Sequence, residues 1–563
     1  MKIKVLSLAV ALTAPLALTA TDYLSATFTN GLPKNSTVER VDAGALDAAA
    51  YKSITDQGWL TASGLALCPT RNDDGTMRAS RLILPAIEIK DAAAIVRWDA
   101  RSMVAQLPES YKVLVRANGE ENWTELEFIE KENYLMTTRY AALSQYVGKT
   151  VEIAFESATP GNSFMIALDN VVIGVPQDSK FAFASTARHY YGDGESVTLG
   201  GVLVNFGAPT KWTSYRLEDI NGTLIEEIPA ETLATLEETQ LEFAYPMSVG
   251  DGIDYNIVAV AADGKRQVLC TEYVVYSHYR RTLLADRFTG TWCNNCPEMT
   301  PTVEGYKVRF GDEAVFTEVH LNDVLENNDY VQGYGSEYVF SIPALIANHN
   351  PATIDYKVLD EELGLETFAL VSTSATRTKS GNVRFSTEAE MCKDLDNSNG
   401  QYTLGYMLLA DLHDPSMGAW KQSNSATSGT NEFAYMPSPI SRDVTYFDGV
   451  VVEASCALWG VSGSLDQQIV AGKKMSHNHT LTIPADFTNF DLTAVAMVID
   501  TTTGCVLNCA AVELPIETPS GIEGIECDTE TDDSRIYDLK GRLVQGQPAP
   551  GIYVQRGKKI LVK

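Results

Sequence analysis

Cys293 and Cys296 are the residues of this sequence whose type and spacing best support chemistry. They lie in LLADRFTGTWCNNCPEMTP (283–301), where an apolar strand is expected to run into a turn and Trp-Cys-x-x-Cys-Pro to open a helix. Unpaired backbone N–H groups and the helix dipole at a helix N-terminus favour thiolate over thiol. The spacing therefore predicts Cys293 as an attacking thiolate and Cys296 as the thiol that resolves the mixed disulfide.

Two metal-binding interpretations fit the cysteine pair poorly. A zinc site needs further ligands, and no second cysteine pair lies nearby. A c-type haem site needs a histidine directly after the second cysteine, where Pro297 stands. His320 is interpreted as a satisfied residue at a strand end and not as a catalytic base. A structural disulfide without redox turnover remains the alternative to an active redox site.

The stretch around the cysteines resembles the thioredoxin family. Trp292 directly precedes the first cysteine, Pro301 lies five residues after the second, and Ser341-Ile342-Pro343 precedes the apolar stretch ALIAN. The resemblance implies a cis Ile342–Pro343 peptide bond beside the disulfide. It further implies that Pro343 belongs to the catalytic site and that Trp292 and Ile342 contact a substrate chain.

Two features depart from the family pattern. Thioredoxins usually bury an acid six residues before the first cysteine, where this chain has Arg287, and Asp286 is one residue out of phase. Side chains alternate along a strand, so Asp286 and Arg287 should point to opposite faces, and a proton relay by the family's route is not expected.

The strand 314–323 fits the fold's central strand. After Pro343, however, the final strand and helix are hard to find, and DEELGLETF could supply only a short helix.

The rest of the 563-residue chain is too long for one hydrophobic core and alternates repeatedly between apolar and polar residues, as in YKVLVRA (111–117). The predicted fold class is multidomain and mainly β, with jelly-roll and immunoglobulin-like sandwiches and one α/β thioredoxin-fold domain. Residues 411–445 are polar and loop-like. The predicted boundaries are 1–20 for a signal peptide, 21–176 for a jelly roll, 177–280 for an immunoglobulin- or fibronectin-like sandwich, 281–365 for the thioredoxin-like domain, 366–515 for a β-sandwich and 516–563 for a linker and C-terminal sorting domain.

Two stretches resemble families of Bacteroidetes secreted proteins. QGWLTAS, SRLILPAIEI, WTEL and LDNVVIG within 21–176 resemble choice-of-anchor J and cleaved-adhesin domains, which are jelly rolls. FTGTWCNNCP and TTTGCVLNCAAVELP within 282–515 resemble an outer-membrane protein family that joins a thioredoxin-like domain to a β-sandwich. The first resemblance implies contact with glycan or extracellular protein through 21–176.

The resemblance of residues 21–176 to these jelly rolls makes a structural calcium ion a candidate ligand, because some such jelly rolls hold one. Asp169 is the natural acidic candidate, but the favoured interpretation is that Asp169 and Asn170 cap a turn before the last strand. No group of carboxylates at calcium-loop spacing supports the metal. The redox-active disulfide is therefore expected to work without a separate cofactor.

Both chain ends carry targeting signals. Lys2 and Lys4 precede an apolar run that ends in Thr19 and Ala20, which is typical of a signal peptide; a buried N-terminal helix is the alternative. IYDLKGR, GIYV and GKKILVK within 535–563 resemble the C-terminal sorting signal of the type IX secretion system. The resemblance implies recognition by the secretion machinery and a final location at the cell surface, at the outer membrane or outside the cell, reached through the periplasm.

The charge and hydropathy of the chain argue against nucleic acid as a partner and against a transmembrane helix. With 73 acidic against 43 basic residues, the net charge of −30 would repel a nucleic-acid backbone. No later stretch has the ~18 uncharged residues of a transmembrane helix. Nine cysteines are few for this length, so the chain is no disulfide scaffold, and Cys505 and Cys509 are too far apart along a strand to bridge.

Together these features predict an exported thiol–disulfide oxidoreductase. It would act through the CxxC site on protein thiols or disulfides at the cell envelope or surface. The alternative is a non-enzymatic surface adhesin, or a glycan- or protein-binding protein, in which the CxxC disulfide is structural.

Overall fold

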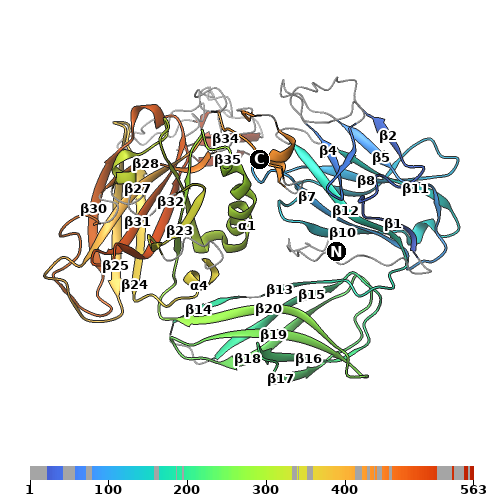
Figure 1. The fold of residues 1–563 in the computed structure, drawn as a ribbon, viewed down its shortest axis with the longest axis horizontal. Coiled ribbons are helices and arrows are strands. Elements are labelled where there is room, and N and C mark those ends of the chain that lie inside the picture. The colour runs from blue at the N-terminus through green and yellow to red at the C-terminus, as the bar shows by residue number, and fades with distance from the viewer. Residues whose placement is uncertain are drawn as a thin grey trace. The chain divides into compact units, whose positions relative to one another are not determined.

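The computed structural model is mainly β and built from several sheets, as the sequence predicts (Figure 1). It forms two compact units, Met1–Pro515 and Ile516–Lys563. The predicted signal peptide and most of the predicted sorting domain lie outside the described residues. These residues are 22–41, 58–70, 79–157, 164–185, 187–192, 196–332, 339, 341–351, 359–412, 421–427, 431–436, 438–440, 447–455 and 459–516, with three short strands between 536 and 562.

The first module is a sandwich of two antiparallel sheets, each with six strands in the described part of the chain. Alternating apolar residues from both sheets meet in one core, where the Trp98 and Phe155 rings lie edge to face with centroids 5.5 Å apart. One sheet contains β1 (Asp22–Ala26), β3 (Leu60–Ala62), β4 (Leu65–Pro69), β7 (Ile95–Ser102), β10 (Thr137–Ala142) and β12 (Met165–Gly174). The other contains β2 (Thr37–Arg40), β5 (Ser80–Ile83), β6 (Ile87–Glu88), β8 (Tyr111–Ala117), β9 (Thr124–Ile129) and β11 (Thr150–Ser157).

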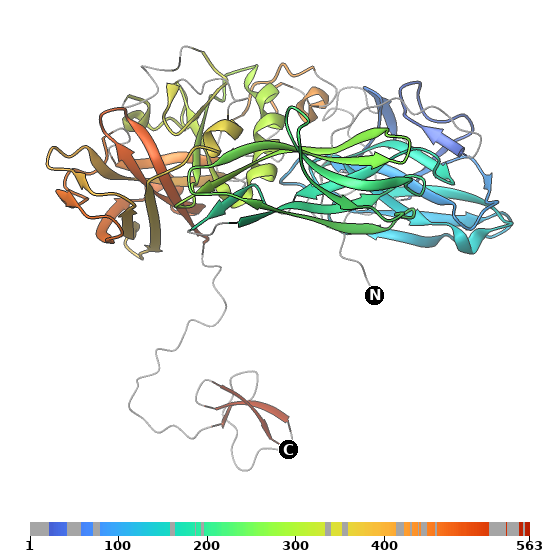
Figure 2. The ribbon, with the colours of Figure 1, turned by 90° about the horizontal axis from the view of Figure 1, so that it is seen from below.

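The second module is also a two-layer sandwich, and its long strands are seen in Figures 1 and 2. Tight turns lie at Asn221-Gly222 and Asp263-Gly264, where Gly222 and Gly264 have φ of 85° and 82° between paired strands. One layer has β13 (Phe181–Ser185), β15 (Ser196–Asn205) and β18 (Glu238–Pro246). The other has β14 (His189–Tyr191), β16 (Trp212–Asp219), β17 (Leu224–Pro229), β19 (Gly252–Ala261) and β20 (Arg266–Ser277).

A seven-stranded sheet, counted over the described residues, joins the cysteine-containing region to the strands that follow it. Its order is β23 (Ala344–Ala347), β21 (Leu283–Thr289), β22 (Ala314–His320), β28 (Phe447–Ser455), β27 (Tyr402–Leu412), β31 (Asp491–Asp500) and β32 (Cys505–Leu514). Strands β21 and β22 are parallel, and β22 meets β28 where Glu318 pairs with Val450. Residues 281–365 and 366–515 therefore share one sheet, and the predicted boundary between them remains a prediction.

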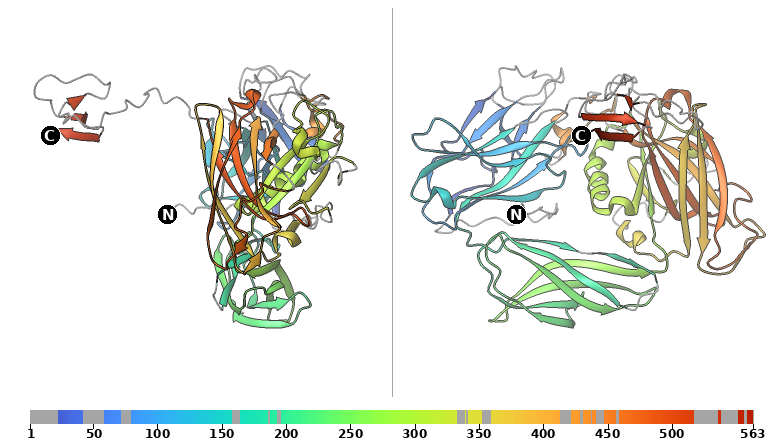
Figure 3. Two further views of the ribbon diagram at one scale, coloured as in Figure 1. Left: turned by 90° about the vertical axis from the view of Figure 1, so that its left-hand side faces the viewer. Right: turned by 180° about the vertical axis from the view of Figure 1, so that it is seen from behind.

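Short helices and a second sheet complete this part of the chain. Helix α1 (Thr300–Phe310) lies between the first module and the strands of the large sheet in Figure 1 and in the right-hand view of Figure 3. Two further α-helices among the described residues are α2 (Asn328–Tyr330) and α4 (Leu359–Leu363), and α4 is the short helix expected from DEELGLETF. The second sheet has β24 (Ala369–Arg377), β25 (Asn382–Met391) and β30 (Met475–Thr482), and β26 (Leu395–Asp396) pairs with β29 (Gln468–Ile469).

The second unit contains one antiparallel sheet near the C-terminus, whose described strands are β33 (Ile536–Tyr537), β34 (Gly551–Gln555) and β35 (Lys558–Val562). Short strands are what the sequence predicts there. Among the described residues of the whole chain, no helix has both the length and the apolar character needed to cross a membrane.

Candidate functional site

The two cysteines of the CxxC motif form a disulfide with Cα atoms 5.5 Å apart. After β21 the chain turns, and the backbone N–H of Cys293 donates to the Gly290 carbonyl at 2.9 Å. Cys296 begins a single 3₁₀ turn (Cys296–Met299), and α1 follows with Pro301 in its first turn. Cys293 thus precedes the first helical turn by three residues, so the helix dipole acts on it less directly than the sequence predicts.

Both sulfur-bearing residues are buried. Cys293 is 5% exposed and Cys296 is fully buried, whereas Trp292 is 51% exposed. The Trp292 indole N–H donates to the carbonyl of Leu321 at 2.7 Å, which ties the start of the motif to the residue after β22. The disulfide therefore presents little surface to an incoming chain, although the tryptophan beside it is open to solvent.

The Ile342–Pro343 peptide bond is cis, as the sequence predicts. Ala344, the first residue of β23, pairs with Phe288 of β21, so Pro343 lies at the end of the sheet where β21 leads into the cysteine motif. The substrate-binding roles of Trp292 and Ile342 and the catalytic role of Pro343 stay predictions.

Asp286 and Arg287 point to opposite faces of β21, as strand alternation predicts. Arg287 is buried beneath the disulfide loop, where its Nη2 donates to the carbonyl of Cys296 at 3.1 Å and to the Thr300 hydroxyl at 2.9 Å. Its Nη1 forms an ion pair with Glu318 at 2.7 Å. A paired guanidinium thus occupies the position where thioredoxins usually bury a carboxyl group, and it cannot accept a proton from a thiol.

Asp286 belongs to a separate buried cluster on the other face. Its Oδ1 accepts from Thr317 at 2.5 Å and from Tyr330 at 2.9 Å, and His349 Nε2 lies 3.4 Å from its Oδ2. Burial raises the pKa of Asp286 to about 7, against these two hydrogen bonds, and lowers the pKa of His349 to about 4. This cluster faces away from the disulfide loop.

His320 belongs to a buried ion network that anchors the start of the disulfide loop. Its Nδ1 lies 2.9 Å from Asp323 Oδ2, which also accepts the backbone N–H of Thr291 at 2.7 Å. Burial lowers the pKa of His320, but the hydrogen bonds and charges of Asp323 and Glu318 outweigh it and leave the pKa raised. His320 ends β22, as expected, and its Nδ1 is paired there, whereas its buried Nε2 has no hydrogen-bond partner and lies 3.7 Å from Glu318.

A segment from the far part of the sheet covers the disulfide loop. We call residues 421–427 the cover segment. Its Ser423 and Ser425 backbone N–H groups donate to the carbonyls of Thr291 and Asn294 at 2.8 and 2.9 Å. The Gln422 side-chain amide donates to the Cys293 carbonyl at 2.9 Å. Further bonds run from the Ser425 hydroxyl to Asn294 O and Asn295 Oδ1 and from the Thr427 N–H to Glu298.

The sequence gives no sign of this contact, because 411–445 is predicted only as a polar, loop-like stretch. The cover segment binds mainly backbone carbonyls, which every sequence presents, so no complementary motif marks the pairing. The cover segment therefore lies hydrogen-bonded along the loop that carries Cys293 and Cys296.

The candidate calcium ligand Asp169 lies within β12 at a β-bulge and not in a turn before the last strand. Its carboxylate accepts the backbone N–H of Asn170 at 2.7 Å, and burial, with the charge of Asp99 adding, raises its pKa to about 6. Lys180 lies 3.1 Å from Asp99. Over the described ranges, no three or more His, Cys, Asp or Glu side chains are grouped so as to hold a metal ion.

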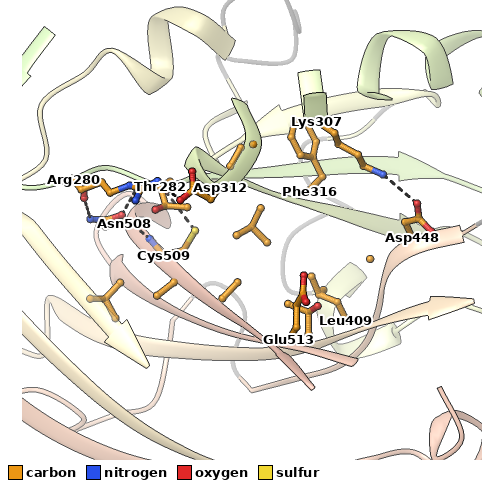
Figure 4. Close-up of a pocket in the computed structure, with 18 of the residues that line it drawn as sticks. Arg280, Thr282, Lys307, Asp312, Phe316, Leu409, Asp448, Asn508, Cys509 and Glu513 are labelled. Atoms are coloured by element: carbon orange, nitrogen blue, oxygen red, sulfur yellow. Dashed lines mark hydrogen bonds and ion pairs between the residues drawn. The ribbon is translucent and has the colours of Figure 1, made fainter. Parts of the chain in front are cut away.

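A cavity of about 750 Å³ lies at the other end of the large sheet from the cysteine motif, between β22 and β32 (Figure 4). Leu409 and Cys509 lie on its apolar side, and Asp448 and Lys307 form an ion pair 3.7 Å long at its rim.

Neither Cys505 nor Cys509, both described, forms a disulfide, in agreement with their predicted separation. Burial raises the pKa of the Cys509 thiol to about 12, which disfavours its thiolate form.

Comparisons with known proteins give structural likeness at low identity. No family model matches the chain, and no curated protein matches it. The solved structure of HBP35 of Porphyromonas gingivalis is 15% identical, with 51% of this chain and 100% of that chain covered and a TM-score of 0.30. The K3 and K1 cleaved adhesin domains of Lys-gingipain from the same species are 16% and 19% identical, cover 27% of this chain and 96% and 97% of their own, and have TM-scores of 0.21 and 0.20.

Proposed function

We propose that this chain is a non-enzymatic binding protein of the cell surface, in which the Cys293–Cys296 disulfide is structural. The observation that carries the proposal is the cover segment, which lies hydrogen-bonded along the disulfide loop and leaves Cys293 only 5% exposed. Exchange with a protein substrate needs in-line access of one sulfur to another, and the burial of Cys293 and the neighbouring cover segment disfavour the approach of a protein chain.

The polar groups around the disulfide support the same proposal. A redox-active CxxC site needs a group that takes up the proton of the resolving thiol, and the Arg287 guanidinium, which occupies the position of the thioredoxin carboxyl group, cannot do so. His320 is held by Asp323 and Glu318 in a structural network. These residues stabilise a fixed loop and do not prepare a reactive sulfur.

The binding activity is assigned to the first module, residues 21–176, with glycan or extracellular protein as partner. Export through the predicted signal peptide would place the module outside the cytoplasm, and the C-terminal unit would be read by the secretion machinery. The test is a glycan and matrix-protein array probed with the full-length mature chain. A set of specific, saturable ligands is expected, and binding to none of them at micromolar chain concentration would count against the proposal.

A thiol–disulfide oxidoreductase acting on protein thiols or disulfides is the second candidate. It is favoured by the half-exposed Trp292 directly before Cys293, because an exposed aromatic side chain beside a cysteine pair offers a contact for a substrate chain. Insulin-disulfide reduction by the wild-type chain, compared with Cys293→Ser, separates the two candidates. Turnover that the substitution abolishes would favour the enzyme.

A further inference from the structure

The cover segment continues into a stretch that is buried in the first module. We call residues 431–436 and 438–440 the anchor segment. Met436 and Ile440, 1% and 0% exposed, belong to one apolar cluster with Met103, Val104 and Leu107 of the first module. Apolar side chains buried this completely hold two elements together through their removal from water.

Hydrogen bonds lock the cover and anchor segments to each other. The Asn424 side-chain amide donates to the carbonyls of Phe433 and Met436 at 2.7 and 3.2 Å. The backbone N–H of Ile440 donates to the Gln422 carbonyl at 2.8 Å. A displacement of the cover segment therefore pulls on the anchor segment, because Gln422 bonds to the disulfide loop and to Ile440, and Asn424 bonds to Phe433 and Met436.

The anchor segment also reaches the disulfide loop directly. The Asn431 amide donates to the carbonyl of Pro297 at 3.0 Å, directly after the second cysteine. In the described part of the two segments, the acceptors used on this loop lie between Gly290 and Glu298, and the Cys293–Cys296 cross-link joins two residues near the centre of that stretch. The carbonyls of Cys293 and Pro297 keep these positions as long as the disulfide is closed.

We propose that the Cys293–Cys296 disulfide controls the docking of the first module through the cover and anchor segments, which makes the junction a redox-sensitive latch. With the disulfide closed, the loop presents its carbonyls and the latch holds the first module. Reduction by a dithiol breaks the S–S bond: the reductant supplies two electrons and two protons, both cysteines become thiols, and the reductant leaves as its own disulfide. The freed loop then no longer fixes the cover segment, and the anchor segment loosens from Met103, Val104 and Leu107.

This inference goes beyond the proposed function and holds for any partner of the first module. A second contact between the modules, from the Gln106 amide to Asp448 at 2.6 Å and Glu304 at 3.2 Å, does not involve the disulfide loop. Reduction is therefore expected to loosen the junction locally without separating the modules.

The test is amide hydrogen exchange on the full-length chain, oxidised and after treatment with dithiothreitol. Exchange is expected to rise about tenfold or more in 421–427, in 431–440 and in 101–107, while β19 (Gly252–Ala261) stays unchanged as internal reference. The Cys293→Ser/Cys296→Ser variant should show the same pattern without reductant, and dithiothreitol should then add nothing.

Met436→Ala gives the reciprocal test without touching the disulfide. It is expected to raise exchange in 101–107 and in the cover segment, since Asn424 and Gln422 couple the two. The proposal is overturned if reduction raises exchange only in 290–300, or if 101–107 keeps its protection in both the reduced wild type and the double serine variant. Reduction of the wild type needs no refolding. Exchange measured on the oxidised and the reduced wild type therefore tests the proposal even where a variant does not fold.

Discussion

Arg287 lies directly beneath Cys296: its guanidinium donates to the Cys296 carbonyl at 3.1 Å while it is paired with Glu318 at 2.7 Å. The positive charge is therefore used to hold the backbone of the disulfide loop and to neutralise a buried carboxylate. Both roles are structural, and several predictions about stability and reactivity follow from this arrangement and from the cover segment.

Arg287→Met is expected to destabilise the chain by roughly 3–5 kcal/mol, because it leaves Glu318 buried without its partner. Arg309→Met is the matched control. Arg309 pairs with Asp360 at 2.9 Å but is 38% exposed, so its loss should cost about 0–1 kcal/mol. Urea denaturation of both variants measures the difference, and equal losses would contradict the buried role of Arg287.

The Cys293→Ser/Cys296→Ser variant is expected to lose about 2 kcal/mol of unfolding free energy. The closed loop has only four residues, and the chain-entropy cost of a cross-link is small for so short a loop. The urea midpoint measured by circular dichroism gives this value. Reductant should lower the wild-type midpoint to that of the variant and leave the variant itself unchanged.

Asp286 makes stability fall as pH rises. Burial raises its pKa to about 7 from 3.8, so the folded state keeps a proton that the unfolded state releases. Its contribution is fully present below about pH 4 and is lost as pH rises through about 7, by roughly 4 kcal/mol.

His349, with its pKa lowered to about 4, acts in the opposite direction between about pH 4 and 6.5. The two contributions nearly cancel between about pH 4 and 6.5, so the net loss of stability is about 1 kcal/mol and is confined mainly to about pH 6.5–7. Urea denaturation at several pH values, compared with Asp286→Asn, measures it. A wild type and a variant with parallel pH profiles would show that Asp286 does not titrate in this range.

Gln422→Leu is expected to speed reduction of the disulfide by dithiothreitol about fivefold. The substitution removes the amide that donates to the Cys293 carbonyl at 2.9 Å, and a hydrogen bond of this kind contributes about 1 kcal/mol. Gln468→Leu is the control, since Gln468 is exposed and bonds to Asp396 away from the site. Reduction rates followed by mass spectrometry after alkylation give the comparison, and equal rates for the two variants would show that the cover segment does not shield the sulfur.

Local rules predict the framework of the candidate site. The apolar run before the cysteines becomes β21, the stretch AVFTEVH becomes β22, and ALIA becomes β23 after a cis proline. The opposite directions of Asp286 and Arg287 follow from strand periodicity alone. These features depend on residues close in sequence, where spacing and alternation determine geometry.

Two features could not be predicted from local sequence: the strand that lies beside β22 in the sheet, and the contact of the cover segment with the disulfide loop. The neighbour of β22 is β28, which begins more than a hundred residues later, and the two share only the Glu318–Val450 pairing. The cover segment consists of small polar residues without periodicity, and it binds backbone carbonyls. Neither partner carries a local signal, because only the tertiary fold brings them together.

The most direct test of the structural disulfide is the rate of insulin-disulfide reduction by dithiothreitol in the presence of the full-length chain. A structural disulfide predicts the uncatalysed rate, the same for the wild type and for Cys293→Ser, because Arg287 occupies the position from which a carboxyl group would take up the proton of Cys296. A wild-type rate well above the uncatalysed one, lost in Cys293→Ser, would contradict it.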